Sequence, residues 1–184
     1  MHRREFDETI AQPLPAAMTT NSSECAWHRT SGTLVSKEIT LTGGAGATVY
    51  DLFTVDGIID IKALYANFTA VTDTTTASNM KFAWHDGTNP NDLTAVVDAS
   101  GATVGSFVSK IGVAADALDF TDGLGGGIVE VASNKPLQET ILVTKAGATN
   151  KIQLLVTQDA ATAATMKCWI AWTCRHEGSY VTAA

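Results

Sequence analysis

"MKCWIAWTC", residues 166–174, contains two apolar sets that alternate along one extended segment. Successive side chains of a β-strand point to opposite faces of its sheet. One set includes Cys168 and Trp172, and the other includes Trp169 and Ala171. The stretch therefore predicts a strand that is apolar on both faces and that carries one tryptophan on each.

Short segments with a similar strand-like composition precede this strand. Turn residues separate them, and successive segments are spaced about ten residues apart. They include "TLVSKEITLT" (33–42), "TVYDLFTV" (48–55), "IIDIKALYANFTAV" (58–71), "NMKFAWHD" (79–86), "TVGSFVSKI" (103–111), "QETILVTKA" (138–146) and "NKIQLLVTQD" (150–159). No segment sustains the 3.6-residue apolar period of a helix. The pattern predicts an all-β fold, an antiparallel β-sandwich or jelly roll.

Two turns in this series have the residues of tight β-hairpins. Asp56-Gly57 is a dipeptide strongly favoured in two-residue hairpin loops, and "GATN" separates the segments 138–146 and 150–159. We therefore expect a hairpin at each of these two places.

The first 30 residues differ from the rest of the chain. The stretch "QPLPAAMTTNSS" contains two prolines and a polar tail, which resist regular structure. We predict an extended N-terminal arm over residues 1–30, followed by a β-sandwich domain over residues 31–184.

Charge and hydropathy exclude several partner classes. The chain has 184 residues with 12 Lys and Arg and a net charge of −7, so a nucleic-acid partner is not expected. It has no apolar run of membrane-spanning length, and its start lacks the apolar core of a secretory signal. We therefore expect no membrane partner and synthesis in the cytoplasm.

The chain has three cysteines. Cys168 and Cys174 lie six residues apart on one proposed strand, about 20 Å, which is too far for a disulfide. Cys25 remains able to pair with either, but free buried thiols are the simpler interpretation and fit a reducing cytosol.

No motif of catalysis or of cofactor binding is found. The chain lacks a serine nucleophile elbow, a phosphate-binding loop and an EF-hand calcium loop. Cys25 with His28, and Cys174 with His176, are spaced like zinc-ligand pairs, but the long separation between the pairs gives no local fingerprint. We predict a protein that is not an enzyme and has no cofactor and no metal, with zinc binding by these four residues left open.

The aromatic residues indicate a contact surface. If the second face of the 166–174 strand met only water, Trp169 would expose a large aromatic surface, and tryptophan is enriched at binding hot spots. Tyr65 and Phe68 are predicted on opposite faces of their own strand. We predict Trp169, with Tyr65 or Phe68 as a neighbour, as interface residues; the alternative is a third layer of the same chain, such as the N-terminal arm.

The chain from about residue 48 to the end resembles small β-rich structural proteins of tailed bacteriophages. The residues that carry the resemblance are "LFTV" with Gly57, the isoleucine-rich segment to Val71, the strand with Lys81 and Trp84, and the closing "WIAWTCRHEGSYV". The resemblance implies a non-enzymatic virion protein made in the host cytoplasm. It implies first a capsid decoration or cement protein, a homotrimer bound to the major capsid protein or another virion protein, and transfers no binding residue.

A tail location is the alternative that the resemblance leaves open. A tail or receptor-binding component with a carbohydrate-binding β-sandwich would place Trp27, Trp84 or Trp169 on one solvent-facing aromatic platform.

Overall fold

The computed structural model describes residues 33–42, 45–71, 78–110, 112–121, 140–145, 147–158 and 163–184. These residues form twelve β-strands and no helix, arranged in two six-stranded antiparallel sheets. The prediction of an all-β antiparallel fold is confirmed. The predicted arm, residues 1–30, lies outside the described residues.

Sheet A has the strand order β1-β11-β3-β7-β8, and β9 pairs with the same edge of β3 as β7. Its strands are β1 (Thr33–Leu41), β3 (Ile58–Val71), β7 (Phe107–Ser109), β8 (Asp119–Thr121), β9 (Thr140–Val143) and β11 (Ala164–Cys174). The strand β11 lies between β1 and β3, so both of its edges are hydrogen-bonded within the sheet.

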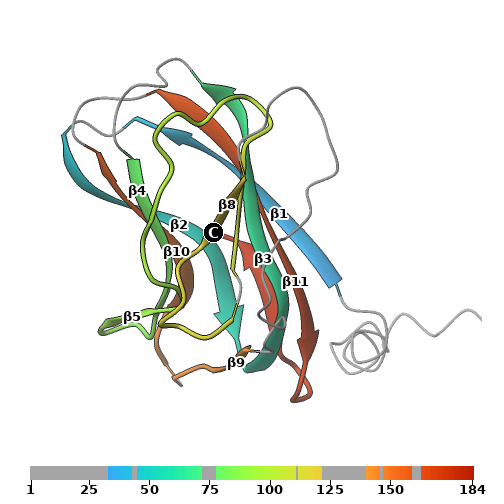
Figure 1. The fold of residues 1–184 in the computed structure, drawn as a ribbon. Coiled ribbons are helices and arrows are strands. Elements are labelled where there is room, and N and C mark those ends of the chain that lie inside the picture. The colour runs from blue at the N-terminus through green and yellow to red at the C-terminus, as the bar shows by residue number, and fades with distance from the viewer. Residues whose placement is uncertain are drawn as a thin grey trace, which may run out of the picture.

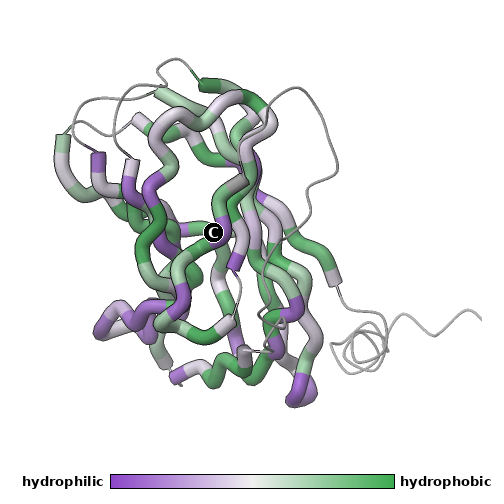
Figure 2. Tube along the Cα trace, in the orientation of Figure 1, coloured by the Kyte–Doolittle hydropathy of each residue, from purple (hydrophilic) through white to green (hydrophobic). Residues whose placement is uncertain are grey.

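Sheet B has the order β12-β2-β10-β4-β5, and β6 also pairs with β4. Its strands are β2 (Gly46–Asp56), β4 (Ser78–His85), β5 (Pro90–Asp92), β6 (Val97–Asp98), β10 (Asn150–Gln158) and β12 (Tyr180–Ala183). Figure 1 shows β1, β3 and β11 on the right and β2, β4 and β10 on the left. Figure 2 shows hydrophilic segments at β5 and at the turn after β11.

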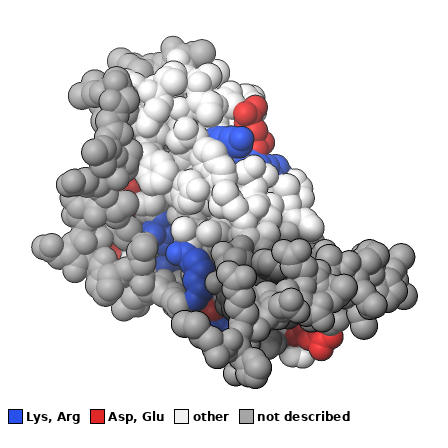
Figure 3. All heavy atoms as spheres, turned by 90° about the vertical axis from the view of Figure 1, so that its right-hand side faces the viewer, with Lys and Arg blue, Asp and Glu red and all other residues white. Residues whose placement is uncertain are grey.

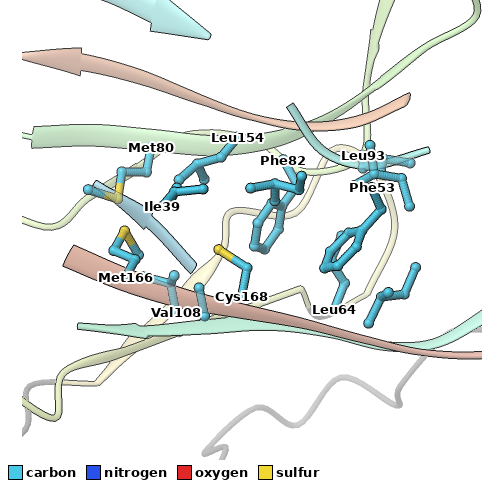
Figure 4. Close-up of a cluster of buried hydrophobic side chains, with 14 of the residues drawn as sticks. Ile39, Phe53, Leu64, Met80, Phe82, Leu93, Val108, Leu154, Met166 and Cys168 are labelled. Carbon is cyan, nitrogen blue, oxygen red and sulfur yellow. The ribbon is translucent and has the colours of Figure 1, made fainter. Parts of the chain in front are cut away.

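The hydrophobic core lies between the two sheets. Figure 4 shows Leu64 and Cys168 of sheet A on one side of the cluster and Phe53, Phe82 and Leu154 of sheet B on the other. All five side chains are almost completely buried. Strands with an alternating apolar set need such a covering layer, because each sheet removes the inner face of the other from water.

The two predicted hairpins are wrong, because each turn joins the two sheets. Asp56-Gly57 connects β2 of sheet B to β3 of sheet A, and the 144–149 turn connects β9 of sheet A to β10 of sheet B. Gly57 has φ +80, and a Cβ at this position would lie 2.2 Å from the hydroxyl oxygen of Ser179. Glycine is required here because φ is positive and because a side chain would collide with Ser179. A corner between two sheets can impose a positive φ just as a hairpin turn can.

Candidate contact surface

The strand pairing of sheet A brings three aromatic residues together on the face that points away from the core. Trp169 of β11 lies opposite Tyr65 of β3, and their rings stack with centroids 5.2 Å apart and an interplanar angle of 20°. The Phe107 ring of β7 lies 5.3 Å from that of Tyr65. Such offset ring pairs stabilise by about 0.5–1.5 kcal/mol beyond their buried area. We call these three residues the aromatic cluster.

A cation lies over the cluster. The Nζ atom of Lys167 is 5.5 Å from the ring centroid of Trp169, within the range of a cation–π interaction. Lys167 also lies directly opposite Glu38 of the edge strand β1. The lysine therefore borders the aromatic cluster on one side and an acidic residue on the other.

Aliphatic side chains extend the same face. Leu34 of β1 is 58% exposed, and Ile141 and Val143 of β9 are 55% and 62% exposed. Their neighbour Leu142 is only 6% exposed and packs in the core, so strand alternation places Ile141 and Val143 on the outside. Figure 3 views the right-hand side of Figure 1 and shows few charged side chains on the described part of that side. We call this surface the outer face of sheet A.

Three polar atoms of this face are buried without a hydrogen-bond partner. They are Oδ1 of Asp60, Oδ1 of Asn67 and the Ser109 hydroxyl. The other carboxylate oxygen of Asp60 forms ion pairs with Arg175 and, at 3.5 Å, with Lys62. A buried polar atom without a partner costs about 1–3 kcal/mol, so each such atom requires a physical explanation.

The structure brings two of the three predicted interface residues together. Trp169 and Tyr65 stack on the outer face, but Phe68 is 3% exposed and belongs to the core. Phe68 is therefore corrected from interface to core residue, since it lies an odd number of residues from Tyr65 and so points inward. Sequence reasoning missed Phe107, although its alternation with the fully buried Val108 was a usable signal.

The cysteines differ from the prediction of free thiols. Cys168 is free and buried, and burial raises the pKa of its thiol to about 12. Cys174 is disulfide-bonded. The prediction is therefore wrong for Cys174, and the thiols no longer favour a reducing compartment.

The structure argues against a zinc site formed by Cys25, His28, Cys174 and His176. A disulfide sulfur is not the thiolate that zinc binds, so Cys174 does not serve as a ligand in this state. Cys25 and His28 lie outside the described residues. Among the residues that the structure describes, no group of three His, Cys, Asp or Glu side chains is close enough to hold a metal ion.

Of the tryptophans considered for a sugar platform, the structure describes Trp84 and Trp169, and of these two Trp169 lies on the outer face of sheet A. Trp84 is 7% exposed and packs in the core between the sheets. Trp27 lies outside the described residues. A platform here consists of Trp169 with Tyr65 and Phe107.

The described part of the chain contains no helix that is long and apolar enough to span a membrane. No protein-family model matches the chain, and neither a curated protein nor a solved structure is significantly similar to it.

Proposed function

We propose that this chain is a non-enzymatic structural protein of a virion, in the first place a capsid decoration or cement protein that stabilises the head of a tailed phage. The observation that carries the proposal is the outer face of sheet A, where stacked Tyr65 and Trp169 and exposed aliphatic residues form a surface suited to another protein. Large aromatic side chains in such positions contribute strongly to association.

The architecture supports this proposal. Consecutive strands lie in opposite sheets along β1 to β4 and again along β9 to β12, which suits a β-sandwich of jelly-roll type. Jelly rolls recur in viral capsid and lectin domains, where the double sheet protects most strand edges. A rigid double sheet with one apolar outer face can transmit force between neighbours in a shell.

The partners in this proposal are the major capsid protein or another virion protein, and further copies of the chain, with a homotrimer as the expected oligomer. The site of action is the virion, after synthesis in the host cytoplasm. Neither nucleic acid nor a membrane is a partner in this proposal, because the outer face of sheet A has few charges and the whole chain is acidic.

Particles purified from the source culture test the proposal directly. Quantitative mass spectrometry is expected to find the chain in a fixed ratio to the major shell protein, and cryo-electron microscopy to locate its double sheet on the shell. Absence of the chain from purified particles would overturn the proposal, and density on the tail alone would replace decoration by a tail function.

The alternative is a tail or receptor-binding component that binds carbohydrate. The stacked pair of Tyr65 and Trp169 favours it, because a flat aromatic surface can pack against a sugar ring. A glycan array tests it: binding by the wild type and loss of binding by Trp169→Ala would support this function over decoration. A control variant, Val49→Ala on the outer face of sheet B, is expected to leave binding unchanged.

A further inference from the structure

The outer face of sheet A has apolar groups that its own chain leaves at least partly exposed. They are the aromatic cluster, whose residues are partly buried, and the exposed Leu34, Ile141 and Val143. The polar atoms of Asp60, Asn67 and Ser109 that lack hydrogen-bond partners lie beneath this surface and are already covered by the chain's own atoms, so an occupant does not reach them. An occupant of this face must therefore supply apolar surface.

Charge restricts the identity of the occupant. By strand alternation and pairing, the outer face has as many cations as anions among the described residues: Lys62, Lys167 and Arg175 against Glu38, Asp60 and Asp119. Three positive and three negative charges sum to zero, so the whole net charge of −7 resides elsewhere on the chain. Two copies of this acidic protein therefore repel each other least when they meet through this face.

Because the outer face of sheet A has equal numbers of positive and negative charges, it can be electrostatically complementary to an identical face. A two-fold contact presents one surface patch to an identical patch, so every group must find its complement within that patch. Glu38 and Lys167 lie opposite each other across β1 and β11, so an identical face offers the opposite charge to each of them. A strongly charged partner, such as a nucleic acid or an anionic membrane, would find no net charge here.

We propose that a second copy of this chain packs its own outer face of sheet A against this one, in a two-fold contact centred on the aromatic cluster. The inference rests on the proposed structural function and deepens it by naming the partner of this surface. The contact buries Trp169 and Tyr65 of both copies and brings Leu34, Ile141 and Val143 out of water. It is a two-fold contact, separate from the three-fold contact that a homotrimer would use.

Analytical ultracentrifugation of the full chain over a range of concentrations tests the inference with a matched pair of variants. Leu34→Lys adds a charge to the outer face of sheet A at a 58% exposed residue, and Val49→Lys adds the same charge to the outer face of sheet B at a 54% exposed residue. We expect Leu34→Lys to raise the dimer dissociation constant at least about tenfold and Val49→Lys to leave it within about twofold. Both residues are exposed, so both variants are expected to fold.

Trp169→Ala gives a second test at the centre of the face. We expect it to raise the dimer dissociation constant about thirtyfold or more. A monomeric wild type at several hundred micromolar would overturn the inference, as would an equal effect of Leu34→Lys and Val49→Lys. Dimerisation only after removal of residues 1–30 would also overturn it, since the arm of the same chain would then cover the face.

The inference and the proposed function fail separately. A chain that is monomeric in solution but present on purified particles would overturn the two-fold contact and leave the virion function standing. A dimer that is absent from all purified particles would leave the contact standing and overturn the virion function.

Discussion

The outer faces of the two sheets differ in how their polar groups are satisfied. On sheet B, the Asp51 carboxylate accepts hydrogen bonds from Lys151 and, at 2.7 Å, from Gln153. Lys81 forms an ion pair with Asp92 at 2.7 Å. No buried polar atom without a partner is found in the described residues of sheet B, whereas sheet A has them at three outer-face positions.

The difference indicates which side of the molecule is complete without a partner. The outer face of sheet B satisfies its charges by cross-strand pairing within one chain. The outer face of sheet A instead has stacked aromatic rings and exposed aliphatic side chains, above polar atoms that are buried without a hydrogen-bond partner. The inner faces show no such contrast, because both sheets contribute fully buried aliphatic and aromatic side chains to one core.

The largest effects on stability are expected for substitutions on the inner faces, where both sheets contribute buried side chains to one core. Leu64→Ala in sheet A and Leu154→Ala in sheet B each remove a buried leucine, with residues 1% and 0% exposed. Each variant should lower the free energy of unfolding by about 2–5 kcal/mol through lost transfer energy and a residual cavity. Urea unfolding measures both. A loss below about 1 kcal/mol for only one of them would break the equivalence of the inner faces.

The two ion pairs should differ in strength. The Asp60 side chain is 2% exposed, whereas that of Asp51 is 36% exposed. Arg175→Met removes one cation from a buried carboxylate and should lower the free energy of unfolding by about 1–3 kcal/mol. Lys151→Met removes a cation from a solvated pair and should cost about 0–1 kcal/mol. Equal losses in urea unfolding of the two variants would contradict the contrast between the faces.

The sequence predicted the strands and their two-sided character because β11 and β3 alternate regularly about Trp169 and Tyr65. Alternation also assigns Phe68 to the opposite face from Tyr65, but it does not say which of the two faces is the core. That choice depends on the second sheet, which is remote in sequence.

The turns and the disulfide were beyond sequence reasoning for a related reason. Asp56-Gly57 meets the same local requirement, a positive φ, in a hairpin and in a corner between sheets. Only the long-range pairing of β2 with β10 and of β3 with β11 distinguishes the two. The state of Cys174 likewise depends on distances that the chain order does not contain.

The contribution of Asp51, on the outer face of sheet B, to the free energy of unfolding should depend on pH. Burial alone would raise the pKa of Asp51, but hydrogen bonds from Lys151 and Gln153 outweigh it and hold the pKa below its ordinary value. A carboxyl with a lowered folded-state pKa stabilises the fold above its unfolded-state pKa, and this contribution is lost as the pH falls through the folded-state value.

Gln153→Leu tests this dependence. It removes one of these hydrogen bonds and should destabilise the chain more at pH 7 than at pH 2, because the contribution of the ionised Asp51 carboxylate is lost as the pH falls. Urea unfolding at the two pH values measures the difference, with Thr157→Leu on the same strand as the control. A deficit that is the same at both pH values would show that the hydrogen bond does not favour the ionised carboxylate.

The smallest effect is expected for alkylation of Cys168, which is next to Trp169 in sequence and lies on the inner face of β11. Cys168 is fully buried, and burial raises the pKa of its thiol to about 12, so only about one thiol in ten thousand is ionised at pH 8. Iodoacetamide at pH 8 should therefore leave Cys168 unmodified in the native chain and modify it in urea, as peptide mass spectrometry measures. Ser36→Cys supplies the matched control at a dilution that leaves the chain monomeric, because residue 36 is exposed on β1 opposite Trp169 and its thiol should then react in the native chain. Similar native reaction rates for the two thiols would mean that β11 does not hold one face inward and one outward, and the contrast between core and outer face would fail at its central strand.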